Sequence, residues 1–336
     1  MAARPCNARR LVVYRWLVDP AVIEYVVEPN YDGWALSDYL AEKLKRPLPA
    51  GVLERSLVDK ALRADTRVSP GMRIGLWKRS PGDSGEPPEV PVVYQDDVLL
   101  VVDKPAGLAL HPTARYHFST LTRALETRHR NAAGQKPDPA HRLDRETSGL
   151  VACGRASRWT RRLKAAFAAR RVEKGYLALV EGSPPQDRFD IDLPLRVGGG
   201  RVKVKVHVDP AGAPAVTTCE VVRRLRGASL LRCVPRTGRQ HQIRAHLLAA
   251  GFPLVGDKLY GPSEEIFLRL AESGGAPAPP GQFDALVTPE ERINLRLWRH
   301  ALHADELVVP HPETGERMRF TAPLPEDMAG LIGQLE

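Results

Sequence analysis

One carboxylate in this chain stands between two arginines and just ahead of a Thr-Ser-Gly turn. Asp144 lies in HRLDRETSGL, residues 141–150, with Arg142 and Arg145 on either side. Cationic neighbours favour the charged form of a carboxylate, so we expect Asp144 to be an anion near neutral pH and to act as a nucleophile or base. The surrounding residues lack the glycine fingerprint of oxidoreductases, the phosphate loop of kinases and the ligand spacing of metal hydrolases.

The segment 141–150 resembles the signature motif of the RluA-type pseudouridine synthases. Further segments are similar to other motifs of that family, in the family's order. They are DDVLLVVDKPAGLALHP (96–112), RVEKGYLALVEG (171–182), TGRQHQIRAHLLAAGFPLVGDKLYG (237–261) and ALHADELVVPHPETGE (301–316). The resemblance extends from about residue 91 to about residue 325, and several matches in order are more specific than any one of them.

This resemblance implies an isomerase that breaks the bond from the sugar of uridine to nitrogen, turns the uracil and rejoins it through carbon. It implies that Asp144 is the catalytic anion and that Arg244 pairs with it. Tyr176 would stack on the target base, and Arg142 would enter the RNA stack as the uridine leaves it. The reaction involves no redox change, so neither a cofactor nor a metal is expected. Whether Asp144 attacks the sugar, attacks the base or removes a sugar proton stays open.

The charge of the chain favours a nucleic acid partner. Its 49 Lys and Arg residues against 40 Asp and Glu residues give a net charge of +9, which favours a polyanion, although a basic surface can also be merely solvated. Basic residues crowd the segment after the signature, where they could contact phosphates. We predict RNA contacts for Arg142, His141, Arg158, Arg161, Arg162 and Lys174, with His141 orienting the signature loop rather than exchanging protons.

The chain is expected to begin with a small module. Residues 1–79 resemble a degenerate S-four-type RNA-binding domain, with apolar residues at helical spacing over 34–44 and 53–62 and a turn and strand over 66–77. A structural cap without RNA affinity is the alternative reading. Residues 80–91, rich in Pro, Gly and acid, predict a linker. The module and the basic face favour ribosomal RNA over transfer RNA as the substrate.

Residues 92–326 are expected to form the catalytic domain. Strands and helices without a regular βαβ rhythm predict an α+β domain on a mixed, mainly antiparallel sheet, consistent with the pseudouridine synthase fold that the resemblance implies. Alternating valines over 201–208 predict a half-buried strand, Gly198–Gly200 a hairpin turn, and Ser157 the start of an amphipathic helix. Residues 262–298 are expected to be a surface insertion.

The four cysteines, Cys6, Cys153, Cys219 and Cys233, lie far apart without a CxxC pair, as is typical of reduced thiols in a cytoplasmic protein. No apolar run approaches the ~18 residues of a membrane span, and the basic N-terminus is not followed by a signal-peptide core. We therefore expect a cytoplasmic monomer that binds RNA and no membrane.

Two other function classes fit parts of the sequence. A non-catalytic RNA-binding or ribosome-assembly factor on the same fold is the first, and the presence of Asp144, Tyr176 and Arg244 argues against it. A glycoside hydrolase needs a pair of acids, and the signature offers only Asp144 and Glu146, which we expect to be a surface or capping acid. The histidine pairs lack the geometry or the third ligand of a metal site: His241 with His246, and His300 with His303.

Overall fold

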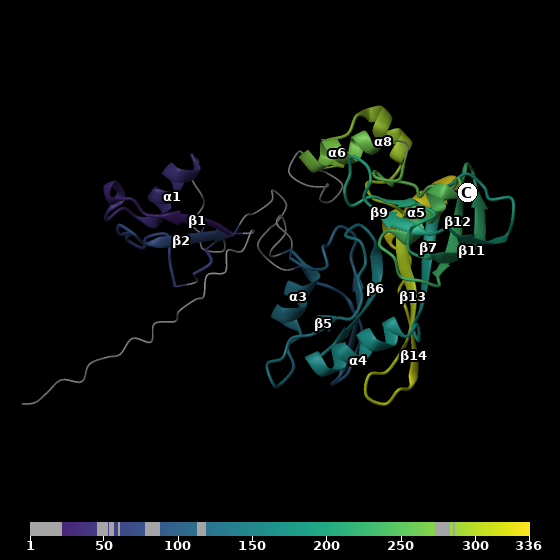
Figure 1. The fold of residues 1–336 in the computed structure, drawn as a ribbon, viewed down its shortest axis with the longest axis horizontal. Coiled ribbons are helices and arrows are strands. Elements are labelled where there is room, and N and C mark those ends of the chain that lie inside the picture. The colour runs from purple at the N-terminus through teal and green to yellow at the C-terminus, as the bar shows by residue number, and fades with distance from the viewer. Residues whose placement is uncertain are drawn as a thin grey trace, which may run out of the picture. The chain divides into compact units, whose positions relative to one another are not determined.

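The computed structural model describes residues 22–45, 53, 57–59, 61–77, 88–112, 119–261, 263–272, 283–284 and 286–336. The chain divides into two compact units, Met1–Arg79 and Ser80–Glu336 (Figure 1). Cys6 and most of the predicted linker lie outside the described residues. Within the described ranges no helix is long and apolar enough to cross a membrane.

The described residues of the N-terminal unit include a two-stranded antiparallel sheet and the helix that packs on it. Its elements are β1 (Val22–Val26), the 3-10 helix η1 (Pro29–Tyr31), α1 (Leu36–Leu44) and β2 (Arg73–Trp77). Leu36, Tyr39 and Leu40 of α1 are fully buried against Ile74 of β2, as the helical spacing over 34–44 predicted. Of the second predicted helix, residues 54–56 and 60 lie outside the described residues, and Leu57 forms a β-bridge with Leu76.

The larger unit contains one extensive sheet with helices on its faces. Its strands are β3 (Val92–Gln95), β4 (Leu99–Lys104), β5 (Asp138–Pro139), β6 (Ser148–Gly154), β7 (Glu173–Glu181), β8 (Arg188–Asp192), β9 (Leu195–Val197), β10 (Val206–Val208), β11 (Val216–Leu225), β12 (Ala228–Pro235), β13 (Leu302–Pro310) and β14 (Arg317–Thr321). Its helices are α3 (Leu121–Arg128), α4 (Ser157–Ala168), α5 (Gln242–Ala249), α6 (Glu264–Glu272), α8 (Pro289–Leu295) and α9 (Glu326–Leu335).

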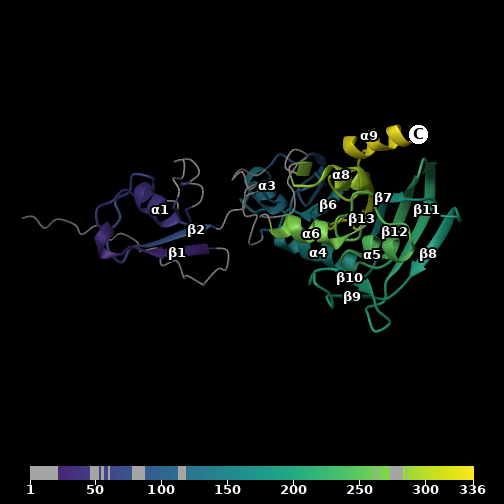
Figure 2. The same ribbon diagram turned by 90° about the horizontal axis from the view of Figure 1, so that it is seen from above.

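The ten-stranded sheet has the order β3-β4-β6-β13-β7-β12-β11-β8, with β14 beside β13 and β5 beside β6. Figure 2 shows the strands following one another from β6 through β7 and β12 to β11 and β8. Every pairing is antiparallel except that of β13 with β6. The predicted α+β domain on a mixed, mainly antiparallel sheet is therefore confirmed.

The two faces of the sheet carry separate cores, because side chains alternate along each strand. On β6, Val151 and Cys153 join the cluster that includes α3 and α5, whereas Leu150 and Ala152 join the cluster beneath α4. As predicted, α4 begins at Ser157 and buries Trp159 and Leu163. Its arginines lie on the exposed side. The helix α5, which follows the third motif, therefore lies on the opposite face of the sheet from α4.

The predicted strand over 201–208 is wrong for its first half. Only β10 is a strand, pairing with β9 through Val206↔Val197. Gly198 and Gly199 have φ of +85° and +91°, a conformation that glycine adopts readily, and they begin the connection between these two strands. Val204 in that connection is 49% exposed, whereas Val202 and Val206 are buried. Alternation of valine with charged residues did not distinguish this folded loop from a strand.

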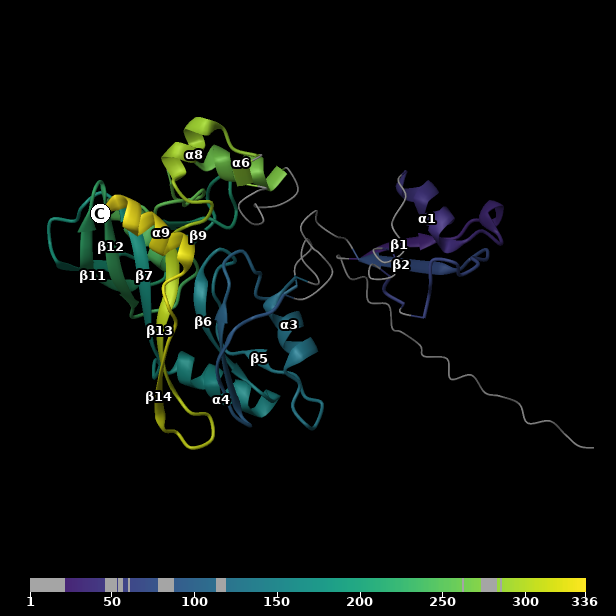
Figure 3. The same ribbon diagram turned by 180° about the vertical axis from the view of Figure 1, so that it is seen from behind.

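In the described part of the segment 262–298, the helices α6 and α8 pack on each other. Ile266 and Leu270 of α6 share a small apolar cluster with Leu295 of α8 and with Phe283. Figure 3 shows the two helices together at one side of the larger unit. The described part of this segment thus has a core of its own, because its apolar residues face each other across the helix pair.

Candidate active site

The loop that carries Asp144 is held by the turn in the DKPAG sequence. Nζ of the fully buried Lys104 donates to three carbonyl oxygens: those of Pro105 and Arg145 at 3.0 Å and that of Leu108 at 3.1 Å. The backbone N–H of Gly107 also donates to the carbonyl of Arg145, at 2.9 Å. Two separate donors therefore hold the residue next to Asp144.

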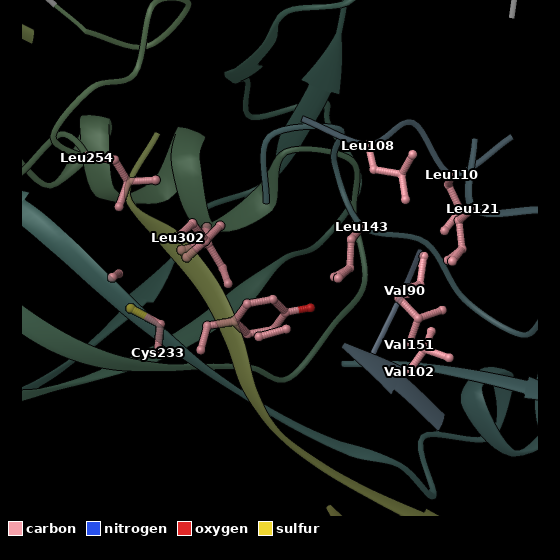
Figure 4. Packing of buried hydrophobic residues seen from close by; sticks show 14 of the residues in the cluster. Val90, Val102, Leu108, Leu110, Leu121, Leu143, Val151, Cys233, Leu254 and Leu302 are labelled. Atoms are coloured by element: carbon pink, nitrogen blue, oxygen red, sulfur yellow. The ribbon is translucent and has the colours of Figure 1, made fainter. Parts of the chain in front are cut away.

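Residues on both sides of Asp144 are anchored in the interior. Figure 4 shows Leu143 between Leu302 on one side and Leu108 and Leu110 on the other. Where β6 begins, Ser148 Oγ lies 3.0 Å from Nδ1 of His303. Gly149 has a φ of +114°, and a Cβ there would lie 2.3 Å from the carbonyl oxygen of Ala304. Only glycine allows β6 to approach β13 so closely, which fixes the direction in which the loop leaves the sheet.

Asp144 is oriented by an arginine from α5. Nη1 of Arg244 donates to Oδ2 of Asp144 at 2.9 Å, while its Nε and Nη2 donate to Asp257 at 2.7 and 2.9 Å. The side chain of Asp144 is 18% exposed, that of Arg244 9% and that of Asp257 0%. The flanking arginines were expected to stabilise Asp144. The pairing of Arg244 with Asp144 that the resemblance implied is present, and Arg145 forms an ion pair with Glu146.

Arg244 and Asp257 stabilise each other in their charged forms, although both are buried. Burial opposes ionisation of Arg244, but the charges of Asp257 and Asp144 outweigh it and raise its pKa above the usual range. Burial likewise opposes ionisation of Asp257, yet Arg244 holds its pKa well below the usual range. Asp257 Oδ1 also accepts backbone hydrogen bonds from Leu259 and Tyr260. Arg244 is thus a fixed cation whose orientation is set from behind by Asp257.

His241 approaches the same oxygen of Asp144 as Arg244 does. Its Nε2 is 3.9 Å from Oδ2 of Asp144, and its Nδ1 is 3.0 Å from the hydroxyl of Tyr260, which accepts a hydrogen bond from the backbone N–H of Val206. Burial lowers the pKa of His241 to about 4. The ring is therefore neutral at physiological pH and is a hydrogen-bonding group rather than a second cation.

Glu146 is not a surface or capping acid, as was expected. It is 8% exposed and forms an ion pair with the buried Lys258 at 2.9 Å. Burial opposes its charge, but Lys258 and the neighbouring cations lower its pKa to about 2. A buried carboxylate is stable only when it is paired, and Lys258 belongs to the GDKLYG sequence that also provides Asp257. One short segment therefore supplies a partner to Glu146 and a partner to Arg244.

A cavity of about 230 Å³ opens at Asp144. Its lining includes Arg142, Asp144, Lys174, Tyr176 and Arg244, so the structure brings together five of the predicted site residues from three segments of the chain. Burial, reinforced by the charge of Asp144, raises the pKa of Tyr176 above its usual range, and burial lowers the pKa of Lys174. In the described ranges, no group of three or more His, Cys, Asp or Glu residues is placed to hold a metal ion.

The remaining predicted site residues do not line this cavity. His141 accepts a hydrogen bond from the backbone N–H of Ala152 at 3.1 Å and stacks on Phe167, with ring centroids 4.6 Å apart. Burial lowers its pKa to about 3, so it is a neutral ring that supports the start of the signature loop. Arg158, Arg161 and Arg162 were expected to lie beside the proposed site. They lie instead on α4, across the sheet from α5, and do not line the cavity.

The sequence prediction missed Asp257, Lys258 and His241. All three occur in the segment 237–261, which was quoted for its resemblance. One signal was present: an adjacent Asp and Lys in an otherwise apolar stretch, LVGDKLYG, are buried only if each finds a partner of opposite charge. Their partners come from other segments, so the tertiary structure was needed to identify them.

Comparison with known proteins identifies relatives of this chain. A sequence profile described as RNA pseudouridylate synthase matches residues 98–249. The ribosomal large subunit pseudouridine synthase D of Xanthomonas campestris is 37% identical over 260 residues, covering 74% of this chain and 71% of that protein. The protein of the same name from Zymomonas mobilis is 34% identical over 326 residues, covering 90% and 94%.

Solved structures show the same fold. Human RNA Pseudouridylate Synthase Domain Containing 4 superposes with a TM-score of 0.54 at 24% identity, covering 73% of this chain and 92% of that one. Human RNA Pseudouridylate Synthase Domain Containing 1 gives a TM-score of 0.53 at 23% identity, covering 74% and 94%. The sequence matches show that the chain belongs to the RluA-type family of RNA pseudouridine synthases, isomerases that convert uridine in RNA to pseudouridine.

Proposed function

We propose that this enzyme isomerises one or more uridines of large-subunit ribosomal RNA, with Asp144 as the catalytic anion. One observation carries the proposal: the carboxylate of Asp144 faces a cavity that Tyr176 also lines, and Arg244 fixes it there. The names of the bacterial relatives support the choice of ribosomal RNA. The net charge of +9 suits any RNA and does not choose between RNA classes.

The contacts of Asp144 leave one of its oxygens for the substrate. Arg244 and His241 both approach Oδ2, and among the described residues none forms a hydrogen bond or ion pair with Oδ1. An oriented anion of this kind can act on the sugar or on the base. The bond from the sugar C1′ to N1 breaks, the bond from C1′ to C5 forms, the proton on C5 is lost to water, and N1 takes up a proton from water. These steps balance without an added reactant.

The uridine would have to leave the RNA stack to reach Asp144. Flipping a base out costs a few kcal/mol, and stacking on an aromatic ring returns about 1 to 3 kcal/mol. Tyr176, whose buried hydroxyl stays protonated, offers such a ring. Arg142 is exposed at the mouth of the same cavity, where a planar guanidinium can occupy the space that the base leaves.

The substitution Asp144→Asn tests this proposal. It keeps the shape of the side chain and removes its charge, so we expect isomerisation to be lost while RNA affinity stays within about a few-fold. The measurement is tritium release from RNA that carries 5-tritiated uridine, together with filter binding of the same RNA. Substantial turnover by the variant would contradict the role of Asp144.

The substrate is identified by a separate experiment. Pseudouridines are mapped in total RNA from a strain that lacks the gene, from its parent, and from the deletion strain complemented with either the normal protein or Asp144→Asn. We expect a site in large-subunit ribosomal RNA to disappear in the deletion strain and to return only with the normal protein. Loss of sites in transfer RNA alone would overturn the ribosomal assignment and leave the catalytic one intact.

A further inference from the structure

A second cavity, of about 750 Å³, adjoins the one in front of Tyr176. Six residues line both cavities: Arg142, Leu143, Asp144, Gln240, His241 and Arg244. The two spaces therefore meet at Asp144 and Arg142, and Tyr176 lines only the smaller one. The volume of the second cavity lies in the range of small-molecule sites, about 300 to 1,000 Å³.

Part of the wall of the second cavity comes from segments that the proposed reaction does not use. Leu110 and His111 follow the DKPAG turn, Val204 lies in the connection between β9 and β10, and Phe267 belongs to α6 in the segment 262–298. Phe267 is partly buried and packs against the cluster that contains Leu259. An aromatic ring and aliphatic side chains thus surround much of the space.

We propose that this second cavity binds the base of a nucleotide adjacent to the target uridine, so that two neighbouring bases of the RNA leave the stack together. The proposal rests on the function proposed above. Consecutive bases are joined by one sugar-phosphate unit, and the two cavities adjoin at a shared wall that includes Arg142 and Asp144. The segment 262–298 then contributes to substrate recognition through Phe267.

The chemistry of the lining favours a base over a phosphate. Six of its sixteen residues are apolar: Ala109, Leu110, Leu143, Val204, Leu259 and Phe267. Lys258, a cation in the lining, is already paired with Glu146, and burial lowers the pKa of His111, so neither adds a free positive charge for a phosphate. Arg142, at the shared wall, can contact the backbone between the two bases.

A double-mutant cycle between the protein and its RNA tests the proposal. The RNA is a stem-loop that carries the mapped uridine, with an abasic nucleotide placed in turn on its 5′ and 3′ sides. The protein variants are Phe267→Ala and Val204→Ser. Val204 is 49% exposed, so its substitution leaves the fold intact even if Phe267→Ala lowers the melting temperature. Ile293→Ala is the control, since Ile293 is a 74% exposed residue of α8 in the same segment and lines neither cavity.

We expect an abasic nucleotide at one of the two flanking positions to raise KM of the normal enzyme about tenfold, the scale of one stacked base, with kcat nearly unchanged. Phe267→Ala should raise KM for the intact RNA and lose most of its effect on that abasic RNA. Val204→Ser should show the same pattern with a smaller increase in KM. Ile293→Ala should have the same KM as the normal enzyme on every RNA.

The outcomes separate this proposal from the one on which it rests. If Phe267→Ala raised KM by the same factor on the intact and the abasic RNA, the second base site would be overturned, although isomerisation continued. Equal KM for intact and abasic RNAs would also overturn it, and would leave the sugar-phosphate backbone as the occupant of the cavity. A normal enzyme that releases no tritium from any RNA would instead contradict the proposed function.

Discussion

Arg244 and Asp257 form a buried bidentate ion pair, with N–O distances of 2.7 and 2.9 Å, and this pair sets the one remaining guanidinium nitrogen toward Asp144. The same arginine is therefore both a structural and a functional residue. Removing one partner of a buried pair costs about 3 to 5 kcal/mol, because the other charge is left uncompensated. The loss of Arg244 alone would mix a folding defect with a catalytic one.

The double variant Arg244→Met/Asp257→Asn separates these two effects. We expect Arg244→Met alone to lower the melting temperature and abolish activity. Adding Asp257→Asn removes the unpaired charge while the amide oxygen can still accept the backbone N–H groups of Leu259 and Tyr260, so stability should largely return. Activity should stay absent, because nothing orients Asp144. Thermal melts and tritium release measure the two properties, and recovery of turnover in the double variant would show that Arg244 acts only on the fold.

Tyr176 should act through its ring and not through its hydroxyl. The side chain is 7% exposed and lies in the main apolar cluster, and no hydrogen bond from its hydroxyl to a described residue is found. Tyr176→Phe is therefore expected to keep kcat within about threefold, whereas Tyr176→Leu should lose roughly tenfold or more through the missing base stack. Single-turnover rates at saturating RNA measure this, with melting curves of both variants alongside. Equal losses in both variants would assign a role to the hydroxyl.

The sequence predicted the central site well because its residues belong to contiguous motifs. Asp144, Tyr176, Arg244 and Arg142 were each identified within a short segment, and they line one cavity. The fold class followed for a similar reason, since strand and helix periodicity are local. The sequence could not show that α4 and α5 lie on opposite faces of the sheet, because that depends on the side of the sheet over which each connection passes.

The errors have physical causes of their own. Glu146 was placed at the surface because most glutamates are exposed, and its buried partner Lys258 is remote in sequence. The alternation over 201–208 resembled a strand, but a loop that buries Val202 and exposes Val204 produces the same pattern. In both cases tertiary packing determines the structure, and local sequence does not.

Arginines beside the cavity should contribute more to RNA binding than those on α4. Arg236 and Arg239 are exposed in the loop between β12 and α5, and Arg239 lines the cavity, whereas Arg161 and Arg162 lie across the sheet from α5. Reversal of each pair to Glu changes the charge equally. We expect the first double variant to weaken binding and to reduce the slope of log affinity against log salt by about 1.4, at about 0.7 per contact on single strands.

The α4 pair was the one that the sequence favoured, and it serves as the matched comparison. A larger effect of Arg161→Glu/Arg162→Glu would place the RNA across α4, as first predicted. Salt titrations of binding for both double variants and the normal protein decide between the two faces, and kcat at saturating RNA should barely change in the α4 variant.

The ion pair of Glu146 with Lys258 should make stability depend on pH. The pKa of Glu146 is lowered from an ordinary value of 4.5 to about 2, so its contribution is present above pH 4.5 and is lost as the pH falls toward 2. Glu146→Gln lacks this contribution and leaves Lys258 unpaired. We therefore expect the normal protein to be more stable than Glu146→Gln at pH 6, and the difference in unfolding free energy to shrink by about 2 kcal/mol by pH 3.

Urea unfolding of both proteins across this pH range measures the difference directly. Glu313→Gln is a suitable control, because Glu313 is exposed in the turn between β13 and β14 and surface substitutions usually change stability by less than about 0.5 kcal/mol. A difference for Glu146→Gln that stays constant from pH 6 to pH 3 would mean that Glu146 is not held as a buried anion. The support that it gives to the loop next to Asp144 would then have to come from hydrogen bonding and not from its charge.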